Sequence, residues 1–398
     1  MDYIDKCCIC GGEIQKIYEI KFKDLIGIEE SDYIENIGYC SRCGFLFNAN
    51  PFNEKQLENR YKNFSKYEFN DNNKNFIESK DFIKRSNIQK KFIEENCDKK
   101  IESIFEIGAA TAYNLNLYKQ EGKKVFGIEP SKKNKEIALE KYGINLYSDT
   151  LQNYLKDETI EHSKFDLIFL SGFLEHIVNP MQCIQNLASF SNKYIFIDVP
   201  TFDFKFSDEV YGMFSDEHVN YFTFESIQNI MSKANYHLVN ARIEFYLDCY
   251  VPAGTPGLLS IWEKNEDGKE YNSRKIINNS LEIFNNYIKD SEKLIKKIEE
   301  KLEKIDDKER LAIWGAGNHT SRLLAMTSLS KKNIVKIYDS DIKKQGHKLL
   351  GKEICQFNIN DFEKDNVEKI LISSYASQNV ILKSMEKEDI IKKIITLY

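Results

Sequence analysis

The stretch Ile104-Phe105-Glu106-Ile107-Gly108-Ala109-Ala110-Thr111-Ala112 indicates the fold class of this chain. It has the pattern of a short apolar strand that ends in an acidic residue and a glycine, followed by small residues and a helix. A second strand ends at Glu129 in the sequence Gly-Ile-Glu-Pro. Small residues at such a turn let the backbone approach a ligand, and a carboxylate closing the second strand can accept hydrogen bonds from both hydroxyls of a ribose. The two features predict a site for an adenosine-containing cofactor.

Strand-like and helix-like segments alternate on the C-terminal side of this turn. Further apolar runs occupy 124–129, 165–170 and 193–199, with amphipathic segments between them. This alternation predicts a parallel, doubly wound α/β sheet. Two more strand-like segments, 236–247 and 257–263, are expected to form an antiparallel edge.

The 398 residues are enough for two or three domains. We expect a small metal module at 1–50, a helical connector at 51–98 and the first α/β domain at 99–265. Between 266 and 308 the apolar residues follow a heptad pattern, which predicts a long helix that either packs on its own chain or forms an intermolecular coiled coil. A second α/β domain is expected at 309–398, where the alternation of strands and helices restarts.

The charge pattern excludes several classes of partner. Lys and Arg number 56 against 62 Asp and Glu, so the net charge is only −6, which argues against a protein that coats nucleic acid. No window is apolar enough for a membrane span, and the N-terminus lacks the pattern of a signal peptide. These features predict a cytoplasmic protein that binds neither nucleic acid nor membrane.

Two CxxC pairs lie near the N-terminus, Cys7 with Cys10 and Cys40 with Cys43, and a glycine follows each pair. Two turns that each present two thiolates predict a tetrahedral four-sulfur site, the geometry that Zn²⁺ prefers. A closed thiolate shell leaves no position for water, so this zinc would be structural. The alternatives are unpaired core cysteines, an iron–sulfur centre or a redox dithiol, and Cys8 could compete with Cys7 as a ligand.

The charge of the first turn distinguishes between nucleotide cofactors. A dinucleotide-binding turn has the pattern GxGxxG around the pyrophosphate, whereas this turn has one glycine and presents Glu106. A carboxylate is unfavourable beside phosphate and favourable beside an ammonium group. The turn therefore favours S-adenosylmethionine over NAD.

The sequence resembles the class I S-adenosylmethionine-dependent methyltransferases, with Ala110 and Ala112 in place of two glycines of their first motif. The segment 165–180, FDLIFLSGFLEHIVNP, resembles their fourth strand. The resemblance implies a Rossmann-like sheet in which the methionine part is held by Glu106, Gly108 and the backbone of Leu170, Ser171 and Gly172. It further implies that Glu129 binds the ribose and Asp149 the adenine amine. A degenerate domain without cofactor is the alternative.

A candidate catalytic segment follows the strand at 193–199. It contains Glu217, His218 and Tyr221, and it lies after the carboxyl end of a parallel strand, where such sheets place their active sites. A histidine can remove the acceptor's proton, and Glu217 or Tyr221 could orient it or the substrate. The alternative is a solvated or structural pair. His176 is the next candidate for the base.

The order of domains, together with EHxxYF at 217–222, resembles the three-domain sugar methyltransferases. That resemblance implies a small nucleotide-linked sugar as substrate, C-methylation, and a role in polysaccharide biosynthesis. Asp216 departs from the family's HEHxxYF pattern, and O- or N-methylation stays open. The chain is expected to be a monomer or a small homo-oligomer.

A second glycine turn, Gly315-Ala316-Gly317, begins the last domain, and Asp339 closes the next strand. The last domain resembles the C-terminal domain of the same sugar methyltransferases, and the turn could bind a dinucleotide or the substrate's nucleotide, or be purely structural. Two other functions therefore stay open at this point. One is a nicotinamide-dependent oxidoreductase or epimerase that uses this turn, and the other is a zinc-scaffolded binding protein without activity.

Overall fold

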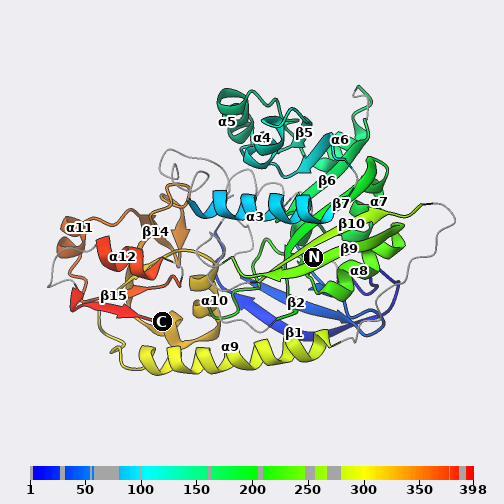
Figure 1. Cartoon of the computed structure of the whole chain (residues 1–398). Helices are drawn as coiled ribbons and strands as arrows, with labels where there is room; N and C mark the ends of the chain where they lie inside the picture. Colours follow the sequence, from blue (N-terminus) through cyan, green and yellow to red (C-terminus); the bar gives the residue numbers. More distant parts are fainter. Residues whose placement is uncertain are drawn as a thin grey trace.

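The computed structural model contains three sheets and one long helix (Figure 1). The residues it describes are 3–26, 32–53, 56–57, 80–98, 100–159, 163–204, 209–246, 256–266, 279–375, 377–384 and 391–398. The predicted fold class is confirmed. Along the chain, an N-terminal module with four clustered cysteines is followed by a Rossmann-like sheet and then by a second α/β sheet. Among the described helices, none has the length and apolar character that crossing a membrane requires.

The N-terminal sheet is antiparallel and takes its last strand from a distant part of the chain. Its strands, in spatial order, are β1 (Ile14–Phe22), β2 (Tyr33–Cys40), β3 (Leu46–Asn48) and β8 (Asn220–Tyr221). In the last pairing Leu46 lies opposite Tyr221 and Phe47 opposite Asn220. The segment with the candidate base His218 therefore leads directly into a strand of the N-terminal module.

The central sheet carries the cofactor turn. Its strands, in spatial order, are β5 (Lys124–Ile128), β4 (Ser103–Ile107), β6 (Phe165–Ser171), β7 (Ser191–Pro200), β10 (Gly257–Lys264) and β9 (Tyr236–Glu244). The first four strands are parallel, and β10 pairs antiparallel with both β7 and β9. The predicted antiparallel edge is thus confirmed. Parallel strands end at the same edge of the sheet, which brings the turns after β4, β5 and β6 together.

Helices cover both faces of the central sheet. One face packs against α3 (Lys80–Asn96), α4 (Tyr113–Lys119) and α5 (Lys132–Tyr142). The other packs against α6 (Leu151–Lys156), α7 (Pro180–Ala188) and α8 (Phe224–Lys233). Because both faces are covered, the strands are apolar almost throughout, which is why their sequences are continuous hydrophobic runs. Of the expected connector at 51–98, α3 is described, and 58–79 lies outside the described residues.

In the turn after β4, the two alanines that replace glycines adopt the left-handed backbone conformation. Gly108 has φ +73°, and Ala110 and Ala112 also have positive φ, at 46° and 64°. A left-handed conformation costs an alanine roughly 1 kcal/mol. The turn is nevertheless closed, because the N–H groups of Gly108 and Ala109 both donate to the Ile128 carbonyl at 3.0 Å. The main chain of the neighbouring strand therefore helps to fix the cofactor turn.

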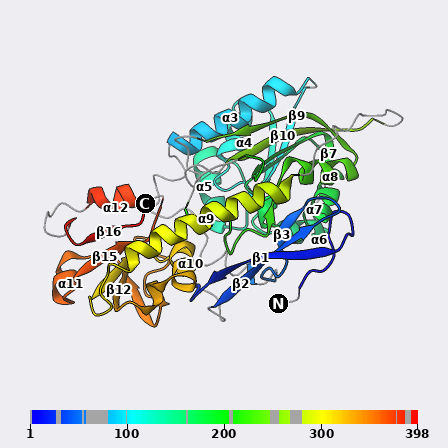
Figure 2. The ribbon, with the colours of Figure 1, turned by 90° about the horizontal axis from the view of Figure 1, so that it is seen from below.

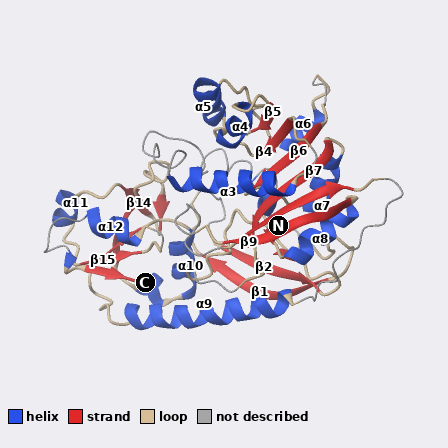
Figure 3. Cartoon of the chain, in the orientation of Figure 1, coloured by secondary structure: helices blue, strands red, loops and turns tan. Residues whose placement is uncertain are grey.

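The C-terminal sheet is a second parallel sheet with one antiparallel edge strand. Its strands, in spatial order, are β13 (Lys348–Leu349), β14 (Lys352–Cys355), β12 (Ile334–Tyr338), β11 (Leu311–Trp314), β15 (Lys369–Ile372) and β16 (Ile394–Thr396). Its helical segments are α10 (Asn318–Met326), η3 (Ser328–Lys331), α11 (Ile359–Lys364) and α12 (Gln378–Ser384). Figure 3 shows β14 and β15 of this sheet with α10, α11 and α12 around them.

The heptad-patterned helix is α9 (Ser280–Leu302), and residues 267–278 lie outside the described part of the chain. It extends past both the N-terminal sheet and the C-terminal domain (Figure 2). Phe284 and Ile298 are buried in a hydrophobic cluster shared by these two parts of the chain. Burial of an apolar stripe along a helix is the expected result of a heptad pattern. The helix thus joins the first and last domains through a common core.

Candidate functional site

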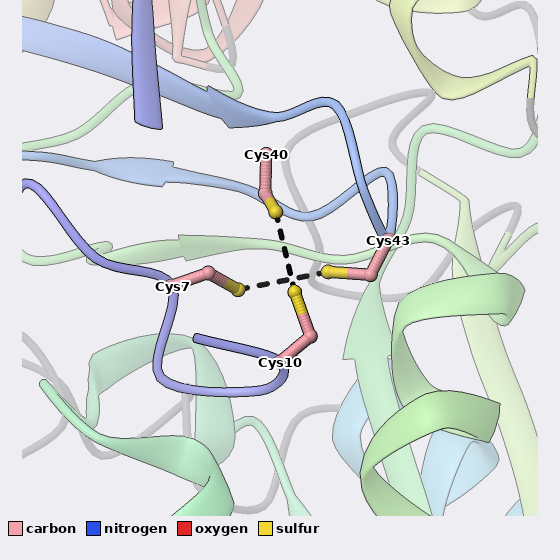
Figure 4. A group of neighbouring side chains, drawn as sticks. All are labelled: Cys7, Cys10, Cys40 and Cys43. Atoms are coloured by element: carbon pink, nitrogen blue, oxygen red, sulfur yellow. Dashed lines mark hydrogen bonds between the residues drawn. The ribbon is translucent and has the colours of Figure 1, made fainter. Parts of the chain in front are cut away.

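The four cysteines of the two CxxC pairs come together in one cluster (Figure 4). Their sulfur atoms all lie within 4.8 Å of one another, with Cys7 and Cys43 at 3.6 Å and Cys10 and Cys40 at 3.4 Å. A tetrahedral zinc with bonds of about 2.3 Å separates its sulfur ligands by about 3.8 Å. The hydrogen bond from the Cys43 thiol lowers the pKa of Cys7 to about 5, which favours a thiolate. The sulfur arrangement fits a four-coordinate thiolate site.

Gly12, the second residue after the first cysteine pair, lies too close to the sulfur atoms for any side chain. A Cβ atom at Gly12 would lie 2.9 Å from the Cys40 sulfur and 3.2 Å from the Cys10 sulfur. The Gly12 N–H also approaches the Cys10 sulfur at 3.4 Å. A side chain at this position would therefore press on two of the four sulfurs.

The cysteine cluster is fastened to the elements around the candidate catalytic segment. The side-chain amide of Asn229, on α8, donates to the Cys43 carbonyl at 3.4 Å, and Ser280, at the start of α9, donates to the Gly44 carbonyl at 2.9 Å. Phe45 stacks on Phe222 with 5.9 Å between ring centroids. The cysteine module therefore packs against residues 217–222 and the helices next to them.

The residues expected to bind the cofactor lie at the carboxyl edge of the central sheet. Glu106 lies in the last two residues of β4, Gly108 directly follows that strand, and Glu129 directly follows β5. Leu170 and Ser171 end β6, and Gly172 follows it. Asp149 follows Tyr147, which bridges to Ile128 beside β5. Because these strands are adjacent and parallel, the structure brings the whole predicted set to one edge.

Glu106 has the properties required to bind an ammonium group. Its side chain is only 3% exposed, one oxygen accepts from Asn114 at 2.8 Å, and the other oxygen is buried without a hydrogen-bond partner. Burial raises the pKa of this carboxyl to about 8, and the nearby Glu129 adds to the shift. A cationic amino group would supply the missing donor and the opposite charge. The site thus fits the aminoacyl end of S-adenosylmethionine.

Glu129 organises the turn as well as the second strand end. One carboxylate oxygen accepts the Ala110 N–H at 2.9 Å, and the other accepts the Ser131 N–H at 3.0 Å. The side-chain amide of Asn134 also approaches the Ser131-bound oxygen at 3.4 Å, so three donors hold this carboxylate at the carboxyl edge of the sheet. Asp149 accepts from the Thr150 N–H and the Asn153 amide, both at 2.7 Å, which holds its carboxylate at the same edge.

A polar network above β6 and β7 was not predicted from the sequence. Asp198, 1% exposed near the end of β7, accepts hydrogen bonds from Arg85, Gln89 and Tyr246. Arg85 and Gln89 also donate to the Ser171 hydroxyl, at 3.3 and 2.8 Å. The acidic strand end at Asp198 was visible in the sequence, but nothing there indicated that α3 crosses above it.

The candidate base lies beside a buried carboxylate and a second histidine. The side chains of Glu175, His176 and His218 offer ligand atoms that all lie within 4.8 Å of one another, and the two imidazole centroids are 4.9 Å apart. A Cβ atom at Gly172 would be 3.7 Å from a Glu175 oxygen. The three side chains therefore adjoin the carboxyl edge of the central sheet where the cofactor is expected to bind, which we call the cofactor edge. The sequence pattern pointed to both histidines as candidate bases, whereas Glu175 was noted only as part of the Glu175-His176 motif and was given no role.

Glu217 and Tyr221 hold the segment through different atoms. The Glu217 carbonyl interacts with His176 Nδ1 at 2.9 Å. The Tyr221 hydroxyl, fully buried, donates to the Glu35 carboxylate of β2 and approaches the His218 carbonyl at 3.2 Å. Tyr221 thus contacts His218 through the backbone.

The C-terminal domain also reaches this segment. Asn318, the first residue of α10 after the second glycine turn, donates to Asp216. Arg322, 1% exposed on the same helix, donates to the Phe214 carbonyl and pairs with Glu209. Asp339, expected near a ribose, accepts the Ala316 N–H at 2.7 Å and pairs with Lys344 at 3.0 Å. The second glycine turn therefore adjoins the segment that carries His218.

The buried Glu35 carboxyl gives a pH dependence that can be measured. Burial raises its pKa to about 8 from 4.5, although the bond from Tyr221 opposes the shift. The folded state therefore holds a proton that the unfolded chain releases, and the free energy of unfolding should fall as the pH rises through this window. Glu35→Gln, a neutral isostere, should gain about 1 to 3 kcal/mol relative to the wild type between about pH 5 and about pH 9.

Denaturant unfolding at several pH values measures this difference. Glu140→Gln, at an exposed position on α5, is the matched control. Its free energy of unfolding should differ from that of the wild type by the same small amount at every pH. A Glu35→Gln protein whose stability follows the wild type in parallel at every pH would contradict the prediction.

Comparisons with known proteins agree with this reading of the central domain. Residues 69–241 match the family model of a methyltransferase domain, and residues 307–396 match the model described as C2185-like, N-terminal. Residues 69–241 therefore form a methyltransferase domain within the chain. No curated protein matches the chain.

Several solved structures are similar to the chain. One is the 1,6-didemethyltoxoflavin-N1-methyltransferase of Burkholderia thailandensis, with 11% identity, TM-score 0.40, and coverage of 57% of this chain and 97% of that one. Another is an S-adenosylmethionine-dependent methyltransferase from Archaeoglobus fulgidus, with 16% identity, TM-score 0.36, and coverage of 46% and 94%. A third is the magnesium protoporphyrin IX methyltransferase of Synechocystis PCC 6803, with 10% identity, TM-score 0.37, and coverage of 54% and 100%.

The role of Glu129 can be tested by cofactor affinity. We expect Glu129→Ala to lose about 1.5 to 3 kcal/mol of cofactor binding free energy, because the Glu129 carboxylate is the expected acceptor for the ribose hydroxyls. Calorimetric titration with S-adenosylhomocysteine measures it. Glu140→Ala, which removes an exposed carboxylate on α5 away from the site, should bind nearly as the wild type does. Unchanged affinity in Glu129→Ala would remove Glu129 from the site.

Proposed function

We propose that the protein transfers a methyl group from S-adenosylmethionine to an activated, nucleotide-linked sugar or a related glycan precursor. The observation that carries this proposal is the position of His218, beside His176 and Glu175 and next to the Gly172 turn of the cofactor edge. Bound S-adenosylmethionine would supply the electrophilic methyl group. A base at this position can take the proton that the acceptor loses.

The residues of the chain divide the work of the reaction. Glu106, Gly108 and the Leu170–Gly172 backbone would hold the methionine part, Glu129 the ribose and Asp149 the adenine. His218 would receive the acceptor proton on an imidazole nitrogen, while Glu217 and Tyr221 fix its backbone on both sides. The methyl group moves to the acceptor atom that loses its proton. C-methylation is the favoured outcome through the family resemblance, with O- and N-methylation as the alternatives.

The contact between the last domain and the catalytic segment supports a substrate with two ends. Asn318 and Asp216 join the second glycine turn to the segment of His218. A sugar near His218 could therefore extend its nucleotide toward Gly317 and the N-terminus of α10, which is a favourable environment for a phosphate. This arrangement favours a nucleotide-linked acceptor over a single small ring.

We also propose that the four cysteines hold a structural zinc ion. The sulfur separations fit its tetrahedral shell, and the shell is complete without water. A reducing compartment such as the cytoplasm would keep the four thiols available for the metal.

Two measurements test the proposed function. The purified protein is denatured and the released small molecules are identified, with S-adenosylmethionine or S-adenosylhomocysteine as the expected result. The protein is then incubated with S-adenosylmethionine and a panel of nucleotide-linked sugars, including keto-deoxysugars, and products heavier by one methylene are sought by mass spectrometry. Release of NAD would support an oxidoreductase or epimerase instead. Binding of a sugar nucleotide without turnover would support a zinc-scaffolded binding protein.

A further inference from the structure

Three potential metal ligands that are not cysteines meet beside the cofactor edge. Glu175 and His176 belong to the short helix η2 (Leu174–His176), and His218 comes from the segment before β8. Their ligand atoms all lie within 4.8 Å of one another. A divalent cation with bonds of about 2.1 Å separates its ligands by about 3 to 4.2 Å. The three ligand atoms therefore lie close to the separations that one cation requires.

The hydrogen bond at His176 has the form found at metal-bound histidines. Its Nδ1 lies 2.9 Å from the Glu217 carbonyl, which can only accept, so Nδ1 carries the proton and Nε2 carries the lone pair. Metal-bound imidazoles commonly donate their second N–H to a backbone carbonyl, which fixes the ring and its tautomer. The carbonyl belongs to the residue directly before His218, so this bond joins the His176 ring to the backbone of the segment that carries His218.

Glu175 supplies a second, independent indication of a missing ligand. The residue is 3% exposed, and its Oε2 atom is buried with no hydrogen-bond partner. A buried carboxylate oxygen without a donor is costly, and a cation would satisfy it. The nearby Arg85 does not fill this role, because its guanidinium pairs with Asp198 at 2.9 Å and donates to Ser171.

We propose that Glu175, His176 and His218 form a binding site for a divalent transition-metal cation such as Zn²⁺ or Co²⁺. Two imidazoles and one carboxylate suit these ions better than Mg²⁺ or Ca²⁺, which prefer oxygen ligands. The site is separate from the four cysteines. Its effect on catalysis rests on the proposed function: a lone pair of His218 that is bound to a cation cannot accept a proton, so occupation of the site inhibits methyl transfer.

A cobalt titration tests the binding directly. The tag-free protein is first loaded with one equivalent of Zn²⁺, which fills the cysteine cluster and has no visible absorption. Co²⁺ is then added, and we expect one further equivalent to bind with visible bands of nitrogen and oxygen ligation, without the thiolate charge-transfer band. His176→Gln should weaken this binding at least about 10-fold. His218→Gln, in the other element of the site, is expected to do the same, so the test does not depend on one variant folding.

The control is His347→Gln, which removes an exposed histidine in the C-terminal domain and should leave the cobalt titration unchanged. The proposal is overturned if the zinc-loaded wild type binds no equivalent of Co²⁺. It is also overturned if His176→Gln and His218→Gln both bind Co²⁺ as the wild type does. In the same titration, methyl transfer should fall as the visible bands grow. Cobalt binding without inhibition would leave the site in place and remove His218 as the base, so the two proposals can fail separately.

Discussion

Cys40→Ser is expected to lose the bound metal and most of the methyl transfer together. Structural zinc contributes on the order of 10 kcal/mol to the folding of a small module, and serine completes a thiolate shell poorly. In this chain the consequence extends beyond the module. β3 follows the second cysteine pair and pairs with β8, and the Asn48 N–H donates to the Val219 carbonyl at 2.7 Å. Val219 is the residue directly after His218.

Loss of the metal should therefore release the segment that carries the candidate base. We expect turnover to fall at least ~10²-fold, the lower range for loss of a positioned proton acceptor. Metal analysis by mass spectrometry and a methyl-transfer assay measure the two effects on one sample.

Two controls separate this effect from general damage. Cys355→Ser changes a half-buried thiol on β14, outside the cluster, and should keep both metal and activity. Wild-type protein treated with a chelator should lose activity and regain it when one equivalent of Zn²⁺, enough for the cysteine cluster alone, is returned. A Cys40→Ser protein that holds no metal yet turns over normally would show that the cysteine module does not support the catalytic segment.

His218→Ala is expected to lower turnover by ~10²- to 10⁴-fold, the usual contribution of a positioned general base. Cofactor affinity should barely change, because the base acts on the acceptor and not on the methyl donor. Steady-state kinetics with a verified acceptor gives the turnover number, and calorimetry with S-adenosylhomocysteine gives the affinity.

The variants for comparison lie on the same and on distant elements. His347→Ala, at an exposed position in the C-terminal domain, should retain turnover. If His218→Ala also retains it, His218 is a structural residue of the segment, and His176→Ala becomes the next variant to assay, because its ring lies 4.9 Å from that of His218.

Local sequence patterns were sufficient to predict the strands and helices, the cysteine cluster and the edge of the sheet where the cofactor is expected. The run 104–112 predicted a strand, a turn and a helix because apolar periodicity and small residues report on burial and backbone conformation within a few residues. The CxxC spacing predicted the cysteine cluster for the same reason, since each pair needs only one turn of chain. The order of parallel strands then brought Glu106, Glu129 and Ser171 to one edge, because strands linked by helices end on the same side.

The contacts between distant segments could not be predicted in this way. Nothing near Asn220 or Tyr221 indicates that they complete the N-terminal sheet, or that Tyr221 donates to Glu35. The position of Arg85 against Asp198 depends on where α3 crosses the sheet, which its own sequence does not state.

The sequence by itself therefore determined the α/β class of both large domains, the cysteine cluster and the cofactor edge. Only the tertiary structure decided that the cysteine module holds the segment of His218, and that Glu175 and His176 stand beside this residue. The physical reason is the range of the forces involved. Periodicity and turn chemistry act over a few residues, whereas strand pairing and side-chain clusters depend on how whole elements pack around a shared core.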